Sequence, residues 1–311
     1  MELYFAPLEG VTDFTFRMTH RKYYGGPDRY YIPFLTPTQT HVLAPKERRE
    51  VLPAHNLDTH AVPQLLTKSS EDFNWAAQVL KDLGYGMVNL NLGCPSGTVV
   101  PKGKGSGFLA DPDRLDAFLE EVFTAGVLPV SVKTRLGLRD PEEFDEILEI
   151  YAKYPLAELI IHPRTREEMY QGPLHPEYYE KAVTALSCPV CYNGDIRTAD
   201  QIRALADRQT PPAAVMIGRG LIADPGLALR WQGKKPAAET FGAFCDELSL
   251  AYLERFGSQK NTLMRMKHLW SYWLEDHPHG EKLWKKMRKC NDWPTFYAMG
   301  RQILAEGDWH P

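Results

Sequence analysis

The segment Ala157-Glu-Leu-Ile-Ile-His162 is an apolar run of strand length that ends in a polar side chain. A near-continuous apolar run of this kind is typical of a parallel strand that is covered on both faces. Similar β-rich runs recur along the first 220 residues, at Leu3–Pro7, Tyr30–Leu35, Ala61–Leu66, Gly86–Leu92, Pro129–Arg135, Pro189–Asn193 and Ala213–Ile217. Together they predict eight strands.

Helical segments separate these runs. Residues 70–84 form one such segment, with Ser69 or Ser70 as the N-cap and Gly84 at the C-terminal end. Asp111-Pro112 and Asp140-Pro141 each place a proline in the first turn of a further helix, and Thr198 with Asp200 begins a fourth. Eight strands that alternate with helices or long loops predict a (β/α)₈ TIM barrel of about 250 residues.

The competing α/β architecture is a doubly wound Rossmann sheet, which would carry G-x-G-x-x-G directly after its first strand. The sequence there is Ala6-Pro-Leu-Glu-Gly-Val-Thr-Asp13 instead. The glycines of Gly103-Lys-Gly-Ser-Gly107 have the wrong spacing, and no G-x-x-x-x-G-K-[ST] motif occurs. The barrel is therefore the favoured fold.

The alternation of strands and helices stops after Trp231-Gln-Gly-Lys-Lys-Pro236. Beyond it the apolar residues follow a helical period and fall on one face, namely Phe241, Phe244, Leu248, Tyr252 and Leu253. We expect a catalytic barrel over residues 1–235 and a smaller all-helical domain over residues 236–311. The whole chain has a net charge of −4, whereas the part from Lys234 onward holds 12 basic and 10 acidic residues, which hints at an anionic partner.

Composition excludes several classes of protein. With 43% hydrophobic and 24% charged residues, the 311-residue chain is typical of a globular protein. It has no apolar stretch near the ~20 residues that cross a bilayer, and its N-terminus does not match a signal peptide, so we expect a cytoplasmic protein. Five cysteines show no secreted disulfide pattern. Cys188-Pro-Val-Cys191 lies in a strand-like run without a second CxxC, which favours core cysteines over a redox pair or a metal site.

Polar side chains follow most of the predicted strands. The carboxyl ends of barrel strands meet at one mouth, so we expect these side chains to converge there. The set consists of Pro7, Gln64, Asn91 with Cys94, Lys133 with Arg135, His162 with Arg164, Asn193-Gly-Asp195 and Gly218-Arg219.

Each of these residues has a functional interpretation and a purely structural one. The loops after strands seven and eight are typical phosphate sites of barrels, although two tight turns would look the same. Lys133 either extends to solvent or faces an electron-rich ligand such as a flavin. His162 is either a site residue or a satisfied core histidine. Cys94, in a Gly-Pro loop, could be a nucleophile, a general acid that stays protonated at neutral pH, or a core residue.

These segments resemble the tRNA-dihydrouridine synthases. The likeness is carried by Ala6–Asp13 with Arg17, Val62–Gln64, Asn89–Ser96, Val132–Gly137, Ile161–Arg164, Asn193–Asp195 and Met216–Arg219. Its most specific element is Asn91-Leu-Gly-Cys-Pro95, and the likeness continues weakly into Met266-Lys-His-Leu-Trp-Ser-Tyr272. Leu8 stands where the family usually has Met, and Pro163 where Gly is frequent.

The resemblance implies that FMN lies in the mouth, that NADPH reduces it, and that the C5=C6 bond of a uracil in tRNA is then reduced. It assigns flavin contacts to Pro7, Leu8, Glu9, Gln64, Lys133, His162, Asn193, Gly194, Asp195, Gly218 and Arg219. It places Asn91, Arg135 and Arg164 on the substrate side, with Cys94 as the proton donor to C5. The loop Val99–Ser106 varies in the family and could bear on which uridine is chosen.

The segment Lys282-Leu-Trp-Lys-Lys-Met-Arg-Lys289 holds five basic residues in eight. We expect Lys282, Lys285, Lys286, Arg288 and Lys289 to contact RNA phosphates beside Trp284. The alternative is an amphipathic helix that simply packs.

Two further functions stay open. One is an FMN barrel that acts on a free small molecule, such as a dihydroorotate dehydrogenase or an ene-reductase. The other is a non-catalytic RNA-binding barrel protein. For the tRNA-modifying enzyme we expect a monomer without membrane or metal partners.

Overall fold

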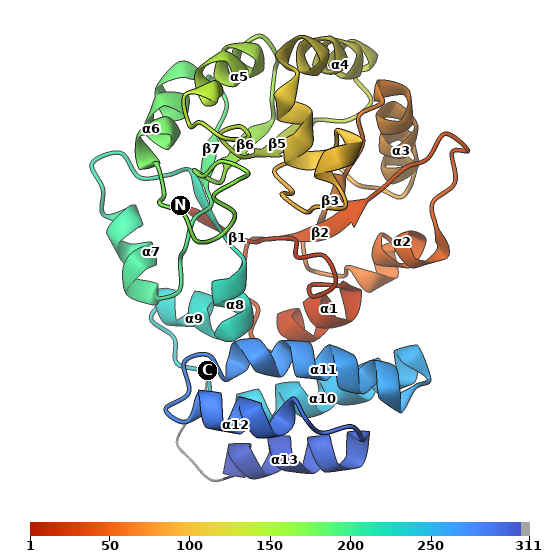
Figure 1. Cartoon of the computed structure of the whole chain (residues 1–311), viewed down its shortest axis with the longest axis vertical. Coiled ribbons are helices and arrows are strands. Elements are labelled where there is room, and N and C mark those ends of the chain that lie inside the picture. The colour runs from red at the N-terminus through yellow and green to blue at the C-terminus, as the bar shows by residue number, and fades with distance from the viewer. Residues whose placement is uncertain (306–311) are drawn as a thin grey trace.

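The computed structural model describes residues 1–305 and contains a closed barrel of eight parallel strands in chain order (Figure 1). The strands are β1 (Glu2–Phe5), β2 (Arg29–Leu35), β3 (Val62–Leu65), β4 (Val88–Leu92), β5 (Val130–Thr134), β6 (Glu158–Ile161), β7 (Val190–Tyr192) and β8 (Ala214–Ile217). Strand β1 pairs with β8 and closes the barrel. The predicted (β/α)₈ fold is confirmed, and each strand begins and ends within two residues of its predicted run.

Helices follow the strands and surround them. They are α1 (Phe14–Tyr23), α2 (Pro45–Glu50), α3 (Ser70–Asp82), α4 (Pro112–Ala125), α5 (Glu143–Ala152), α6 (Pro176–Ala185), α7 (Ala199–Ala206), α8 (Arg219–Ala223) and α9 (Leu227–Trp231). Short 3₁₀ helices are η1 (Pro53–His55), η2 (Val100–Lys102) and η3 (Gly105–Ala110).

Three of the predicted helix starts are confirmed by their caps. The side chains of Ser69, Asp111 and Thr198 accept hydrogen bonds from the first turns of α3, α4 and α7. The predicted start at Asp140-Pro141 was two residues early, because α5 begins at Glu143. The Glu143 carboxylate accepts hydrogen bonds from the backbone nitrogens of residues 138–140, which holds those residues in a turn before the helix.

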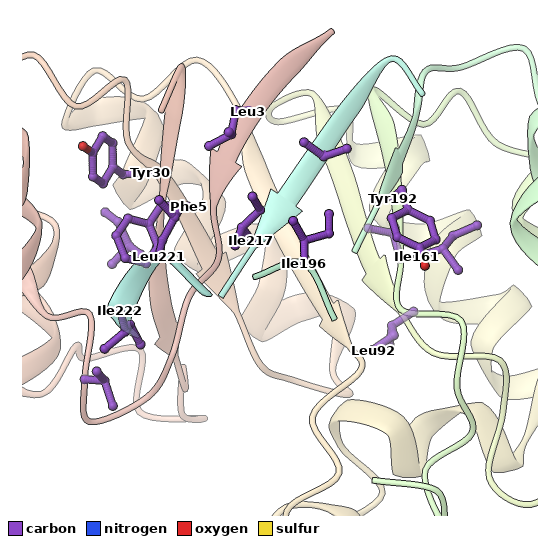
Figure 2. Close-up of a cluster of buried hydrophobic side chains, with 14 of the residues drawn as sticks. Leu3, Phe5, Tyr30, Leu92, Ile161, Tyr192, Ile196, Ile217, Leu221 and Ile222 are labelled. Atoms are coloured by element: carbon purple, nitrogen blue, oxygen red, sulfur yellow. The ribbon is translucent and has the colours of Figure 1, made fainter. Parts of the chain in front are cut away.

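The barrel strands bury both faces. On β1, Leu3 and Phe5 belong to the large core beneath the helices, whereas Tyr4 and Ala6 belong to a second cluster with residues of β2, β6, β7 and β8. Because β6 and β7 do not pair with β1, their residues can join this cluster only through the lumen, so the alternation along β1 separates the outer core from the lumen. Figure 2 shows part of the outer core, where Phe5 and Tyr30 lie with ring centroids 5.7 Å apart.

Polar groups close the lumen at the amino-terminal ends of the strands. The hydroxyls of Tyr4 and Tyr31 donate hydrogen bonds of 2.8 and 2.9 Å to the carboxylate of Glu158, the first residue of β6. All three side chains are buried. Burial raises the pKa of the Glu158 carboxyl. We call this buried Tyr4–Tyr31–Glu158 cluster the floor; it lies in the lumen toward the end opposite the mouth.

The remaining chain forms α10 (Thr240–Phe256), α11 (Gln259–Trp273), α12 (Gly280–Met287) and α13 (Trp293–Ala305). Figure 1 shows these helices, in blue, gathered on one side of the barrel beside α1, α8 and α9. The Phe244 ring of α10 packs edge-on against Phe16 and Tyr24 of the α1 region. Within residues 1–305, no helix combines the length and the apolar character needed to cross a bilayer.

Two arginines join these helices to the segment that follows β1. Arg255 of α10 lies 3.0 Å from the Asp13 carboxylate and 3.1 Å from that of Glu50. Arg265 of α11 donates a hydrogen bond to the carbonyl of Gly10 and lies 3.4 Å from Asp13. These side chains are largely buried, so the contact between the barrel and the C-terminal helices is partly ionic.

Candidate active site

A cavity of about 410 Å³ opens at the carboxyl-terminal ends of the strands. Residues on or after every one of the barrel strands line it, together with two residues of α11. Of the residues predicted from the sequence, it collects Pro7, Leu8, Glu9, Gln64, Asn91, Cys94, Lys133, Arg135, His162, Asn193, Gly194, Asp195, Gly218 and Arg219. The convergence expected at the mouth is therefore present in the fold.

A chain of side-chain hydrogen bonds crosses three strands beneath the cavity. Asn91 donates to Gln64 at 2.7 Å, Gln64 donates to Asn89 at 2.7 Å, and Asn89 donates to Ser131 at 2.8 Å. The four residues occupy alternate positions of β3, β4 and β5, which places them on the lumen face. Each amide is thereby fixed in orientation, which leaves one donor and one acceptor position of Gln64 unused by the chain.

Asn91 also fixes the loop that carries Cys94. Its side-chain oxygen accepts hydrogen bonds from the backbone nitrogens of Gly93 at 3.1 Å and of Cys94 at 2.9 Å. The carbonyl of Cys94 accepts a hydrogen bond from the Ser106 hydroxyl at 2.9 Å. Burial raises the pKa of the Cys94 thiol. The geometry thus presents a protonated thiol at the wall of the cavity at neutral pH.

Lys133 projects into the same space from β5. Its ammonium group makes no ion pair within 4 Å and no hydrogen bond with any residue of the described chain, and the side chain is partly buried. Burial, with the charge of Arg135 beside it, lowers the pKa of Lys133 to about 8. A desolvated ammonium group without a hydrogen-bond acceptor raises the free energy of the folded protein. An electron-rich ligand beside Lys133 would lower it.

The His162 imidazole stays neutral at this site. Its pKa is lowered well below the usual value, first by burial and then by the nearby charges of Arg135 and Lys133. A neutral ring can both accept and donate one hydrogen bond. The Nε2 atom of His162 lies 3.4 Å from Arg164 Nη1 and accepts its N–H, so Nδ1–H is left to contact a ligand without adding a charge.

Asp195 lies between two arginines after β7. Its carboxylate bonds to Arg164 at 3.0 and 2.5 Å and to Arg219 at 2.9 Å. Arg164 does not line the cavity, contrary to the expectation that it faces substrate; it is buried and also donates to the carbonyl of Gly172. Its role in the structure is to hold Asp195, which in turn orients Arg219.

Aromatic residues that the sequence interpretation missed complete the cavity wall. Tyr170, from the loop after β6, has the guanidinium groups of Arg135 and Arg219 within 5.1 and 5.0 Å of its ring centroid. His268 and Tyr272 come from α11, one turn apart, with ring centroids separated by 5.5 Å. Both stand in the weakly similar segment 266–272, whose i, i+4 spacing was the available signal.

The five basic residues of 282–289 lie away from this cavity, on and just after α12. Lys282, Lys285, Lys286, Arg288 and Lys289 are all exposed, whereas Met287 between them is fully buried. The helix therefore packs through its apolar residues and leaves its cations in solvent.

The CxxC cysteines belong to the barrel wall. Cys191 is buried in the lumen cluster and Cys188 is half-buried, and both thiols are free. Residues 1–305 contain no cluster of His, Cys, Asp and Glu arranged to hold a metal ion.

Residues 4–295 match the sequence family described as Dihydrouridine synthase (Dus). The chain is similar to the probable tRNA-dihydrouridine synthase 1 of Synechocystis, with 30% identity over 92% of this chain and 81% of that protein. It is 32% identical to a tRNA-dihydrouridine(16) synthase of Cupriavidus necator, over 74% of this chain and 73% of the relative.

Among solved structures, a morphinone reductase has the same barrel fold, with a TM-score of 0.53 and 15% identity over 76% of this chain and 88% of that one. This likeness concerns the fold alone. The family match spans the barrel, the Cys94 loop and α10 to α12, and on that basis the chain belongs to the dihydrouridine synthase family.

Proposed function

We propose that this protein is an FMN-dependent tRNA-dihydrouridine synthase, which reduces the C5=C6 bond of a uridine in tRNA with electrons from NADPH. The observation that carries the proposal is the position of Cys94, held at the wall of a polar, cationic cavity in a chain of this family. Curated relatives that are named tRNA-dihydrouridine synthases support the substrate class.

The cavity fits a flavin mononucleotide. Lys133 has no acceptor of its own within the described chain, and Gln64 has a free donor and acceptor, so both can bind the edge of a flavin ring. Arg219 and the backbone around Asn193, Gly194 and Gly218 would hold the phosphate. Pro7, Leu8, Glu9, His162 and Asp195 would complete the contacts, and bound FMN would supply hydride for C6 of uracil.

Cys94 would donate the proton that C5 needs. Asn91 and Ser106 fix its backbone on both sides, so the thiol has a defined position before substrate arrives. The raised pKa keeps the proton on sulfur at neutral pH, as a general acid requires. Arg135 holds the same loop from the other strand, because it donates to the carbonyl of Gly93 at 3.0 Å.

A uracil inside tRNA must leave its base stack to enter the cavity and reach Cys94. Tyr170, Tyr272 and His268 stand at the cavity wall and offer flat surfaces for bases. The cations of α12 would hold the RNA backbone outside the cavity. We also propose that NADPH is the reductant, that the protein acts in the cytoplasm, where tRNA is found, and that it is a monomer.

Reduction of tRNA by the purified protein tests the proposal. The protein, reconstituted with FMN, is incubated with NADPH and tRNA isolated from a strain that lacks dihydrouridine, and dihydrouridine is quantified by mass spectrometry. We expect product on tRNA and none on free uridine. A preparation that binds no FMN, or that reduces small enones and leaves tRNA unchanged, would refute it.

A further inference from the structure

Three lysines gather on the rim of the mouth, next to the loop of Cys94. Lys68 follows β3, whereas Lys102 and Lys104 stand on either side of Gly103 in the segment that follows β4. These strands are neighbours in the barrel, and their carboxyl ends face the mouth. We call these three residues the lysine rim.

Backbone geometry brings the three side chains together. Gly103 has a left-handed φ of 65°, which turns the chain between Lys102 and Lys104. The Lys68 Nζ atom lies only 3.7 Å from the point that a Gly103 Cβ would occupy, so its ammonium rests on this turn. The charges of Lys102 and Lys68 both lower the pKa of Lys104, although burial is the largest cause.

No carboxylate neutralises the lysine rim. None of the three ammonium groups makes an ion pair within 4 Å among residues 1–305, whereas Lys46, after β2, pairs with Glu9 at 2.8 Å. The charges of Asp72 and Glu47 raise the pKa of Lys104, but both carboxylates have other partners. Asp72 faces His41 at 3.5 Å, and Glu47 accepts a hydrogen bond from the backbone of Thr36 at 2.7 Å.

The segment that carries the lysine rim also supports Cys94. Ser106 donates to the Cys94 carbonyl through its backbone nitrogen at 3.1 Å and its hydroxyl at 2.9 Å. A side chain at Gly105 would come within 2.8 Å of the same carbonyl, so the two loops are in close contact. A ligand held by Lys102 and Lys104 therefore sits two to four residues from a direct support of Cys94.

From this arrangement we infer that the lysine rim is a phosphate-binding site for the RNA strand beside the uridine that enters the cavity. The inference rests on the proposed function, and it adds a contact on the barrel to those expected on α12. Unpaired, converging ammonium groups suit a phosphodiester, which carries one negative charge and several acceptor oxygens. The segments after β3 and β4 would then grip the RNA backbone next to the thiol.

Charge-neutralising variants test the site. Lys102→Gln combined with Lys104→Gln should weaken tRNA binding about tenfold and flatten the dependence of log affinity on log salt by about 0.7 for each phosphate that is no longer bound. Lys234→Gln with Lys235→Gln, two exposed residues in the linker after α9, makes the same charge change and should bind like the wild type. Lys102→Arg with Lys104→Arg should retain binding, since it retains both charges.

Several results would overturn the inference. Wild-type affinity and salt dependence in the glutamine double variant would remove the phosphate site and leave the proposed function intact. An increased KM for NADPH with unchanged tRNA affinity would assign the lysines to the dinucleotide instead. Failure of the wild-type protein to bind and reduce tRNA would reject the proposed function itself. If the double variant does not fold, Lys102→Gln alone, at an exposed position, carries the test with a smaller expected decrease in affinity.

Discussion

Cys94 is the residue at which the proposed chemistry can be tested most directly. Cys94→Ala should still bind flavin and still be reduced by NADPH, but reoxidation by tRNA should slow by about 10²- to 10⁴-fold, the usual contribution of a general acid. Stopped-flow absorbance of the flavin separates the two half-reactions. Cys188→Ala, which changes a half-buried cysteine outside the cavity, is the control. Equal slowing of both half-reactions would indicate a structural role instead.

The thiol pKa gives this step a pH dependence. Because burial raises the pKa of Cys94, the proton donor remains present through neutral pH and disappears only as pH rises through that raised value. The tRNA half-reaction of the wild type should therefore be level near pH 7 and fall above the ordinary thiol pKa of about 8.5. Cys94→Ala should lack this alkaline decline.

Lys133 should reveal a conflict between stability and ligand binding. Lys133→Met removes a desolvated charge, so the flavin-free protein should gain about 1–3 kcal/mol at pH 7, while its affinity for FMN falls. Between pH 8 and about 10.4 the unfolded wild type binds more protons than the folded one, so its stability should rise with pH there.

Urea denaturation of the flavin-free proteins measures this effect. The Lys133→Met variant should lack the rise with pH. Lys81→Met, at the far end of α3, serves as the control. A variant that is less stable than the wild type at pH 7 would show that Lys133 has a partner in the ligand-free protein.

At the scale of elements, the ionic contact between α10 and the barrel should contribute strongly to stability. Arg255→Met removes a cation that lies within 3.1 Å of both Asp13 and Glu50. Asp13 keeps Arg265 and Glu50 keeps Arg17, so we expect a loss of about 1.5–3 kcal/mol, the usual contribution of a hydrogen bond to a charged group. Lys22→Met breaks an exposed pair with Glu247 that also joins α1 to α10, and it should change the midpoint of urea unfolding very little. Similar decreases in stability for both variants would contradict this distinction.

Helix α12 should act through charge and not through packing. Lys285→Gln with Lys286→Gln should weaken tRNA binding and reduce the salt slope by about 0.7 to 0.9 for each phosphate that is no longer neutralised. Both side chains are exposed, so thermal stability should stay at the wild-type value. A lower melting temperature with an unchanged slope would place the RNA surface elsewhere.

At the scale of the whole molecule, local patterns predicted more than long-range contacts did. Most strands are short apolar runs with a polar residue at or shortly after their carboxyl end, so the barrel and most of its rim could be found from neighbouring residues alone. The position of Arg164 could not, because its partner Asp195 lies 31 residues away. Tyr272 enters the cavity from a helix that begins more than 40 residues after the last barrel strand, so the i, i+4 spacing of His268 and Tyr272 could indicate a shared helix face but not its contact with the mouth.

The floor of the barrel limits the routes by which substrates can reach the flavin. Tyr4, Tyr31 and Glu158 are buried at the end of the lumen opposite the cavity. Under the proposed function, the nicotinamide and the uracil would therefore both reach the flavin through the mouth and could not occupy the same flavin face at the same time. Steady-state turnover should then follow a ping-pong mechanism. Double-reciprocal plots of rate against NADPH concentration at several tRNA concentrations should give parallel lines, and each substrate should inhibit competitively with the other at high concentration. Intersecting lines would mean that NADPH and tRNA bind in a ternary complex, which would require a second route to the flavin besides the mouth.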